Sequence, residues 1–167
     1  EGKLINKMGK NPTKKHLFLT GYMGSGKSSV GALAASQLSL LFYDLDKEIE
    51  RLENSSIADI FRMKGESYFR KKEESTLKKL TGTNKPAIIA LGGGTIINPE
   101  NFKLINESGT LFYLETSSVS IINRLVKETE KRPILARYKT RDELIKFVQN
   151  HLNTRLPIYR RSDFTIN

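Results

Sequence analysis

The chain has 167 residues, 28 of them Lys or Arg and 18 Asp or Glu, and its formal net charge of +10 suggests nucleic-acid binding as a first hypothesis. The length fits one compact domain, and no apolar run approaches the roughly 20 residues that cross a bilayer, which excludes a membrane-spanning helix. The sequence has no cysteine, which excludes disulfides, thiolate catalysis and cysteine-based metal sites, and it has two histidines, His16 and His151.

The positive charge is not spread evenly along the chain. Residues 1–16 hold five lysines and one glutamate, residues 17–123 are neutral overall, and residues 124–161 carry a net charge of +7. We expect residues 1–16, His16 included, to form a disordered basic tail, and residues 17–167 to form one domain. The neutral stretch argues against an extended basic face, so we expect no nucleic-acid partner.

Short apolar runs alternate with longer helical segments, a pattern typical of βαβ units around a parallel sheet. We expect strands at residues 17–20, 40–43, 87–91, 110–114 and 164–166. We expect helices at residues 27–38, 46–79 with breaks near 54–55 and 65, 117–126 and 141–152. A further helix is expected to start at 98–99, with Asn98 as its N-cap and Pro99 at its first position. The charged stretch 127–140 contains Pro133 and lacks helical periodicity, which favours a surface loop.

Residues 21–28, GYMGSGKS, match the P-loop pattern G-x-x-x-x-G-K-[ST] between a predicted strand and a predicted helix. Glycines let successive backbone N–H groups point at phosphate oxygens, where the helix dipole also favours negative charge. Lys27 is expected to reach the β- and γ-phosphates of ATP, and the Ser28 hydroxyl to ligate Mg²⁺. The candidate phosphate-binding residues here are Gly24, Ser25, Gly26, Lys27, Ser28 and Ser29. The alternative is a glycine-rich turn with an exposed lysine.

Asp44 and Asp46 follow the second predicted strand, at the edge of a parallel sheet where ligands bind. Residues two apart on an extended chain point the same way, so one carboxylate is expected near Mg²⁺ and the other to accept a proton from an attacking hydroxyl. The alternative is that one of them only caps the helix that begins there.

Three consecutive glycines, Gly92, Gly93 and Gly94, follow the third predicted strand. A backbone without Cβ atoms can be approached closely by a substrate, so this loop is a candidate binding wall.

Three arginines are weaker candidates. Arg70 lies in a charge-rich helical stretch, and spacing alone does not single it out. Arg132 lies in the charged loop, where it can close over a transferring phosphate, and Arg155 follows a predicted helix, where its planar fork can pair with a carboxylate. Surface charge is the alternative for both, and we interpret His151 as a structural residue on a helix face.

Together these motifs resemble those of the shikimate kinase family over about residues 17–166. The matching segments are the P-loop and residues 44–46, 56–61, 65–70, 92–94, 131–135 and 155–159. Gluconate and nucleotide kinases share the P-loop but not this set. The resemblance implies a three-layer α/β/α P-loop kinase fold with a five-stranded parallel sheet in the order 2-3-1-4-5. It also implies Mg²⁺-dependent transfer of the ATP γ-phosphoryl group to the 3-hydroxyl of shikimate, in the route to chorismate and aromatic amino acids.

The resemblance further implies roles on the substrate side. Asp46 is similar to the residue that binds the ring hydroxyls and acts as base. Arg70 and Arg155 resemble the pair that binds the shikimate carboxylate. Glu73 resembles the acidic residue that orients the shikimate side of the site, and residues 92–94 are expected to line the shikimate pocket.

On the nucleotide side, Asp44 resembles a residue that contacts Mg²⁺ through water, next to Ser28. Arg132 resembles the arginine of a lid at about residues 127–140, and it is expected to be catalytic together with Lys27 and Asp46. Arg124 resembles the arginine that packs on adenine. The family continues past the last strand into a helix and an adenine-side loop, so adenine contacts at that end are not assigned.

Two alternatives stay open at this point. One is another small-molecule P-loop kinase, for gluconate or a nucleotide, and the other is a nucleotide-binding regulator or nucleic-acid binder without catalysis. We expect shikimate and ATP as partners, no nucleic acid or membrane, a monomer, and a cytoplasmic location, or the plastid stroma if the source is a plant.

Overall fold

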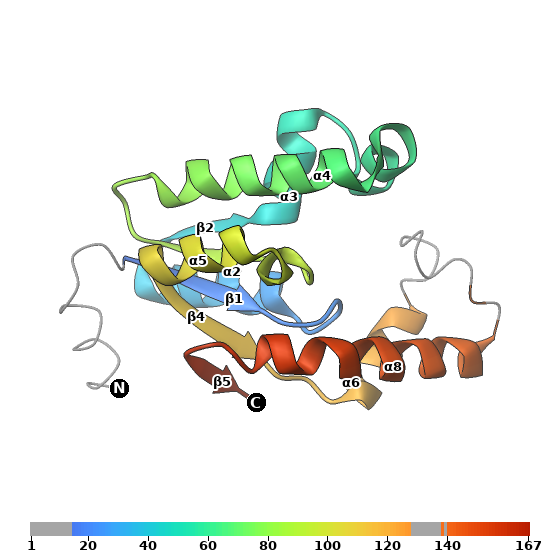
Figure 1. The fold of residues 1–167 in the computed structure, drawn as a ribbon. Helices are drawn as coiled ribbons and strands as arrows, with labels where there is room; N and C mark the ends of the chain where they lie inside the picture. Colours follow the sequence, from blue (N-terminus) through green and yellow to red (C-terminus); the bar gives the residue numbers. More distant parts are fainter. Residues whose placement is uncertain (1–14, 128–137, 139) are drawn as a thin grey trace.

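A computed structural model describes residues 15–127, 138 and 140–167, and Figure 1 shows their arrangement. Five parallel strands form one sheet in the order β2-β3-β1-β4-β5, which confirms the predicted order and the α/β class. The strands are β1 His16–Thr20, β2 Leu41–Asp44, β3 Ala87–Ala90, β4 Gly109–Leu114 and β5 Phe164–Ile166.

The central strand β1 is buried along its whole length. Leu17 pairs with Ile88 of β3 and with Thr110 of β4, so β1 has a neighbour on both edges. Phe18 points into one apolar cluster and Leu17 into the other, because successive side chains of a strand point to opposite faces. A parallel sheet brings the carboxyl ends of β1, β2 and β3 to one edge, which places the loops after these strands together.

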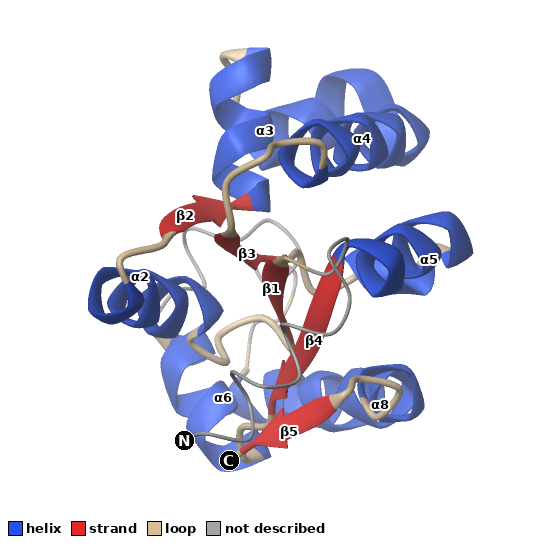
Figure 2. Cartoon of the chain, turned by 90° about the vertical axis from the view of Figure 1, so that its left-hand side faces the viewer, coloured by secondary structure: helices blue, strands red, loops and turns tan. Residues whose placement is uncertain are grey.

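Helices cover both faces of this sheet (Figure 2). The helices are α2 Lys27–Leu38, α3 Leu45–Glu53, α4 Ile57–Thr81, α5 Pro99–Ser108, α6 Ser118–Val126 and α8 Arg141–Tyr159, with a 3₁₀ turn η1 at Thr95–Ile97. Helix α2 packs on one face, α5 and α8 lie on the other, α4 packs beside α3 and α5, and α6 packs against α8. Within the described residues, no helix is both long enough and apolar enough to cross a membrane.

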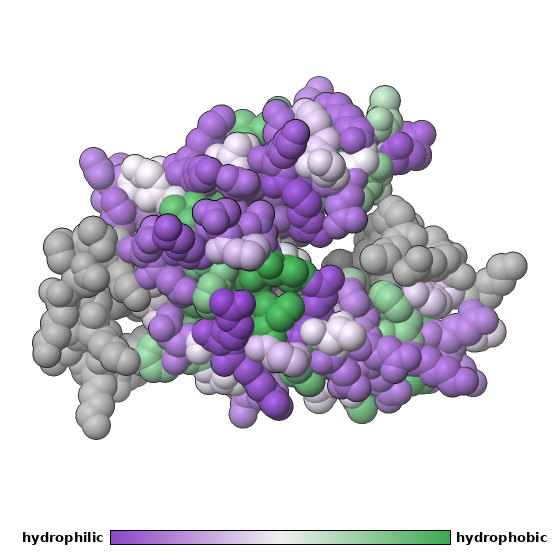
Figure 3. All heavy atoms as spheres, viewed as in Figure 1, coloured by the Kyte–Doolittle hydropathy of each residue, from purple (hydrophilic) through white to green (hydrophobic). Residues whose placement is uncertain are grey.

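The helix starts follow the capping residues of the sequence. Asn98 accepts a hydrogen bond from the Glu100 N–H, with Pro99 in the first turn of α5, as predicted. Hydrophilic residues cover most of the outward surface of α4 and α8, and hydrophobic residues gather in the hollow between α5 and α8 (Figure 3). Leu77 of α4 and Val148 of α8 are fully buried in the apolar core, so both helices turn apolar side chains inward.

A glycine bends α4 in its first half. Gly65 has φ 79° and ψ 171°, which is not helical, and it separates the segment that Ser56 caps from the segment that carries Arg70 and Glu73. This confirms the predicted break at residue 65, and the second break is the turn between α3 and α4.

Most predicted element ends lie within two residues of the observed ends, and two boundaries need correction. The ordered domain begins before residue 17, because the Lys15 N–H donates to the Ser108 carbonyl oxygen and His16 is a fully buried residue of β1. His16 joins the sheet because β1 pairs with β4 from Gly109 onward. The rest of the predicted tail, 1–14, lies outside the described residues.

The second wrong boundary is the end of α8. This helix continues past the predicted end at residue 152 to Tyr159 and includes Pro157. Proline removes one helical hydrogen bond, and the tertiary contacts of the last turn, described below, outweigh this loss.

Candidate active site

The P-loop connects β1 to α2 at the carboxyl edge of the sheet. Gly24 and Gly26 have φ angles of 75° and 96°, in the left-handed region that favours glycine, and Gly26 is the N-cap of α2. Lys27 Nζ donates hydrogen bonds of 2.9 Å to the carbonyl oxygens of Gly21 and Tyr22. The loop therefore presents a helix N-terminus beside a fixed cation, which is a binding site for phosphate groups.

A cavity of about 510 Å³ lies at this helix N-terminus. Its lining residues are Met23, Gly24, Ser25, Gly26, Lys27, Ser28, Ser29, Val30, Asp44, Asp46, Leu91, Gly93 and Arg124. Arg124, at the end of α6, donates a hydrogen bond of 2.8 Å from Nη1 to the Gly24 carbonyl oxygen. The cavity thus contains the predicted P-loop residues, both aspartates and one arginine from another helix.

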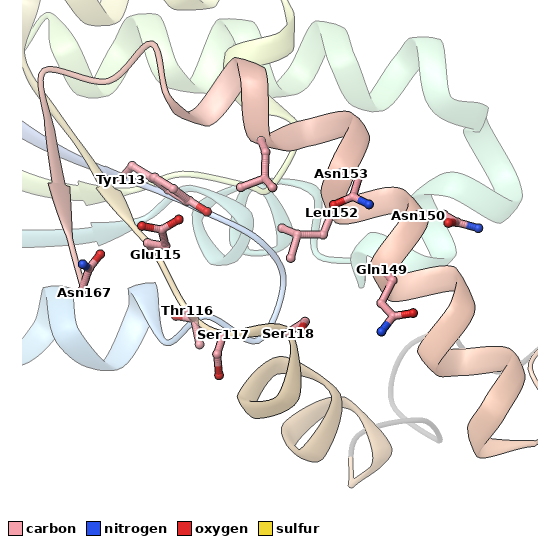
Figure 4. Close-up of a pocket in the computed structure, with 11 residues that line it drawn as sticks. Tyr113, Glu115, Thr116, Ser117, Ser118, Gln149, Asn150, Leu152, Asn153 and Asn167 are labelled. Atoms are coloured by element: carbon pink, nitrogen blue, oxygen red, sulfur yellow. The ribbon is translucent and has the colours of Figure 1, made fainter.

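A larger cavity, of about 830 Å³, lies between α8 and the start of α6 (Figure 4). Its lining residues are Tyr113, Glu115, Thr116, Ser117, Ser118, Gln149, Asn150, Leu152, Asn153, Leu156 and Asn167. None of the side chains that line this cavity is cationic, and Glu115 is the one carboxylate side chain among them. Phosphoryl transfer needs charge neutralisation, so the smaller P-loop cavity is the candidate active site.

Asp44 and Asp46 reach the cavity from different elements, β2 and α3. Asp44 ends the strand and caps α3, where it accepts from the Lys47 N–H, and its other oxygen accepts a hydrogen bond from the Ser28 hydroxyl. Asp46 lies in the first turn of α3 because the helix begins at Leu45. The expectation that both lie on one extended segment is therefore wrong, although both side chains line the cavity. Asp44 caps α3 and also lines the cavity, so the capping role and the site role that the sequence offered as alternatives occur together.

Asp46 has an environment that suits proton transfer. Burial, and then the carboxylates of Asp44 and Glu73, raise the pKa of Asp46 from 3.8 to about 6, and Lys27 opposes this increase. A carboxylate with a pKa near the working pH is a more effective proton acceptor than an ordinary aspartate.

The glycine loop after β3 packs closely against acidic side chains. A Cβ atom on Gly92 would lie 2.9 Å from an oxygen of Asp46. It would also lie 3.1 Å from the Thr95 hydroxyl oxygen and 3.2 Å from an oxygen of Glu73. Thr95 donates a hydrogen bond of 2.7 Å to the same Glu73 oxygen. Glycine at position 92 therefore leaves the room that these three polar groups occupy.

Arg70 also lies beside this loop. Its Nη1 donates a hydrogen bond of 2.9 Å to Glu73, whose side chain is 1% exposed, and its Nη2 lies 3.2 Å from Glu66. A Cβ atom on Gly94 would lie 3.3 Å from Arg70 Nη2. The buried Glu73 thus holds the guanidinium group of Arg70 against the glycine loop.

Helix α8 presents three residues, spaced four apart, to the P-loop and the glycine loop. The Tyr159 hydroxyl donates a hydrogen bond of 2.7 Å to the Gly93 carbonyl oxygen, and His151 Nδ1 lies 2.9 Å from the Tyr22 hydroxyl oxygen. Arg155 lies between them, and its positive charge opposes the increase that burial causes in the pKa of Tyr22 and Tyr159. This side of α8 therefore carries Arg155 to the boundary between the two loops.

A family model described as shikimate kinase matches residues 23–167. Curated relatives named shikimate kinase include one from Chlorobium limicola, 40% identical over 153 residues, which cover 90% of this chain and 76% of the relative. Another, from Caldicellulosiruptor bescii, is 37% identical over 153 residues, which cover 92% of this chain and 86% of the relative. The chain belongs to the shikimate kinase family.

Solved structures of shikimate kinases have the same fold. The enzyme from Bacteroides thetaiotaomicron matches with a TM-score of 0.84 and 32% identity, over 91% of this chain and 85% of that chain. The enzyme from Acinetobacter baumannii, in complex with shikimate, matches with a TM-score of 0.82 and 32% identity, over 93% of this chain and 84% of that chain.

Most residues that the resemblance to shikimate kinases singled out lie in or beside the P-loop cavity. Asp44, Asp46, Gly93, Arg124 and the P-loop residues line it, and Glu73, Arg70, Gly92 and Gly94 adjoin it around the glycine loop. Arg155 lies inside α8, whereas the sequence predicted that it would follow a helix. Arg132 and most of the predicted lid at 127–140 lie outside the described residues.

Sequence motifs of shikimate kinases did not reveal every side chain that shapes this site. Tyr22 occupies a variable position of the P-loop pattern, so the pattern does not predict its role. Thr95 contacts Glu73 across 22 residues of sequence, and no local motif indicates this contact. The spacing of His151, Arg155 and Tyr159 is the signal that was available, because residues four apart lie on one side of a helix.

Proposed function

We propose that this chain transfers the γ-phosphoryl group of ATP to the 3-hydroxyl of shikimate, giving shikimate 3-phosphate and ADP. The observation that carries the proposal is the position of Asp46, which lines the P-loop cavity and lies against the glycine loop that Arg70 also approaches. A phosphate site, a carboxylate and a cation for an anionic acceptor are therefore close together. The relative from Acinetobacter baumannii, which was solved with shikimate, supports this acceptor.

On the nucleotide side, the P-loop N–H groups and Lys27 would bind the β- and γ-phosphates of ATP. Arg124 lines the same cavity and would pack on the adenine ring, where a guanidinium plane stacks favourably. Arg132 would close over the transferring phosphate, and this role rests on the family resemblance.

Mg²⁺ would be held by the Ser28 hydroxyl directly and by Asp44 through water. These two groups share a hydrogen bond, so two hard oxygen ligands already lie together at the P-loop. Mg²⁺ usually takes one or two carboxylates together with phosphates and water, which this pair of oxygen ligands fits. When bound, the ion neutralises charge on the phosphate oxygens.

On the acceptor side, Asp46 would accept the proton of the attacking hydroxyl, since it is the carboxylate with the raised pKa. Arg70 and Arg155 would bind the carboxylate of the acceptor through their planar forks. The buried carboxylate of Glu73 keeps the partly exposed Arg70 in place through their ion pair. Phosphoryl transfer asks the protein mainly to position the reactants and to neutralise charge, and these residues supply both.

An ADP-release assay with shikimate, gluconate, AMP and CMP as acceptors tests the proposal. We expect turnover with shikimate and a kcat/KM at least about a hundredfold lower with the other three compounds. Preferred turnover of gluconate or of a nucleotide would overturn the proposal. Lys27→Met is the control for contaminating kinases, because loss of the phosphate-binding cation should lower kcat by about 10²–10³ without changing the circular dichroism spectrum.

A further inference from the structure

His151 of α8 contacts both the P-loop and Arg155. Its Nδ1 lies 2.9 Å from the Tyr22 hydroxyl oxygen. Its Nε2 lies 3.3 Å from Nη2 and 3.4 Å from Nε of Arg155, which is one helical turn further along. One imidazole ring therefore joins the phosphate-binding loop to an arginine of the proposed acceptor side.

The partners of His151 define where its proton lies. A guanidinium group has only hydrogen-bond donors, so Nε2 must accept from Arg155. The ring is then neutral with its proton on Nδ1, and Nδ1–H donates to the Tyr22 hydroxyl oxygen. Nδ1 is therefore the donor to Tyr22, and Nε2 is the acceptor from Arg155.

Aromatic neighbours fix the orientation of the ring. Phe147 stacks on His151 with ring centres 5.1 Å apart and an interplanar angle of 21°. Tyr22, which is 2% exposed, meets the ring edge-on at 5.5 Å and 71°. Rotation of the imidazole would break the two ring contacts and the hydrogen bonds to Tyr22 and Arg155, so Nε2 is held facing Arg155.

Tyr22 extends the connection to the phosphate site. Its hydroxyl contacts His151, and its carbonyl oxygen accepts the hydrogen bond from Lys27 Nζ. A continuous series of contacts therefore runs from Lys27, through Tyr22 and His151, to Arg155.

We infer that His151 is a positioning residue for acceptor binding, which holds the guanidinium fork of Arg155 in the orientation that receives the carboxylate of the substrate. The inference rests on the proposed function, in which Arg155 binds that carboxylate. Ordering a long side chain on binding weakens affinity, and a side chain that is already held loses less freedom when the ligand arrives. His151 acts through Arg155, so its effect should be on binding of the acceptor rather than on the chemical step.

The test compares two substitutions at position 151 in the full chain. His151→Leu fills the space but cannot accept a hydrogen bond, and we expect it to raise the shikimate KM about tenfold, since hydrogen bonds to charged groups are strong. We expect kcat and the ATP KM to stay within about twofold, because the phosphate site keeps its own ligands. His151→Gln places an amide oxygen near the position of Nε2, and we expect it to restore the shikimate KM to within about threefold of the wild type.

Two further variants separate positioning from packing. Phe147→Leu removes the stacked ring but keeps the Tyr22 contact and the acceptor for Arg155, so its shikimate KM should rise much less than that of His151→Leu. In an Arg155→Ala background, His151→Leu should have no additional effect on the shikimate KM, because its target is gone. An equal increase in KM for Phe147→Leu and His151→Leu, or additive effects in the double variant, would overturn the inference.

Wild-type turnover of shikimate is measured first. If the wild-type protein does not phosphorylate shikimate, the proposed function fails. If it does, and His151→Leu has a normal shikimate KM, the inference about His151 alone is wrong. Thermal melting of each variant shows whether it is folded. If His151→Leu is not folded, His151→Met, alone and in the Arg155→Ala background, takes its place with the same expected shikimate KM values.

Discussion

Tyr159 donates a hydrogen bond of 2.7 Å to the carbonyl oxygen of Gly93, a residue 66 positions earlier in the sequence. The Tyr159 ring also stacks on Tyr113 of β4, with ring centres 5.2 Å apart and an interplanar angle of 21°. Gly93 lines the P-loop cavity, and Tyr159 ends the helix that carries Arg155. This hydrogen bond therefore fixes the glycine loop and Arg155 relative to each other.

Tyr159→Phe tests this connection. The variant keeps the stacked ring but removes the hydrogen bond to Gly93, so we expect the free energy of unfolding to fall by about 1 kcal/mol in urea denaturation. The shikimate KM should rise about threefold, with an unchanged ATP KM, because the acceptor side loses one of its supports. Tyr113→Phe is the matched control, since it changes the other tyrosine of the stack and keeps the bond to Gly93. Equal changes in the shikimate KM for the two variants would contradict this role of Tyr159.

The sequence predicted the parts of this molecule that depend on local signals. The P-loop, the cap at Asn98 and the break at Gly65 are short-range patterns, and the structure has all three. Contacts between distant segments, such as Thr95 with Glu73, have no local pattern and could not be predicted. The end of α8 depends on such contacts too, because Pro157 locally disfavours a helix whereas the distant contacts of Tyr159 favour one.

Gly92→Ala should damage the site more than an ordinary glycine substitution. The new methyl group would lie 2.9 Å from an oxygen of Asp46 and 3.2 Å from an oxygen of the buried Glu73, so at least one carboxylate must move. We expect a loss of about 1–3 kcal/mol in the free energy of unfolding, as is typical of overpacking. A shift of about 1 Å at Asp46 should also lower kcat/KM about a hundredfold.

Gly93→Ala is the control for the stability measurement. The nearest atom to its new methyl group is the Gly21 carbonyl oxygen at 3.6 Å, an ordinary contact, so this variant should unfold close to the wild-type midpoint in the same urea series. If both alanine variants lose the same stability, close packing at Gly92 is not the cause.

Asp46→Asn tests the proposed base. The amide keeps the shape of the side chain but cannot take the proton of the attacking hydroxyl, so kcat should fall by about 10²–10⁴ in the ADP-release assay. Near-normal kcat in this variant would remove the role of Asp46 as base.

The same variant tests the raised pKa of Asp46 in the protein without ligands. Because folding raises this pKa from 3.8 to about 6, the folded state binds more protons than the unfolded state between these pH values. The contribution of Asp46 to stability therefore becomes less favourable as the pH rises through this window. Asp46→Asn removes this dependence, so its Tm relative to the wild type should increase from pH 4 to pH 7 in calorimetry. A difference in Tm that is the same at both pH values would show that folding does not raise this pKa.

Glu53 is the acceptor of a polar cluster that joins α3 to α4 across the bend at Gly65. Its carboxylate accepts hydrogen bonds from Lys72 at 2.7 Å, from Lys64 at 2.9 Å and from the Tyr68 hydroxyl at 2.7 Å, and its side chain is 7% exposed. These donors lower the pKa of Glu53 from 4.5 to about 2.

Glu53→Gln should lower the free energy of unfolding at pH 7, because the amide keeps the size of the side chain but loses both ion pairs. A lowered pKa means that the stabilisation is complete above about pH 4.5 and is lost as the pH falls toward 2. Urea denaturation between pH 7 and pH 3 should therefore show the wild type and the variant converging below pH 4.5. Glu74→Gln is the matched control, since Glu74 is 33% exposed and pairs with Lys78 on the surface of α4, where an ion pair contributes little. A difference between wild type and Glu53→Gln that stays constant down to pH 3, or an equal loss in Glu74→Gln, would show that the cluster around Glu53 does not stabilise the fold.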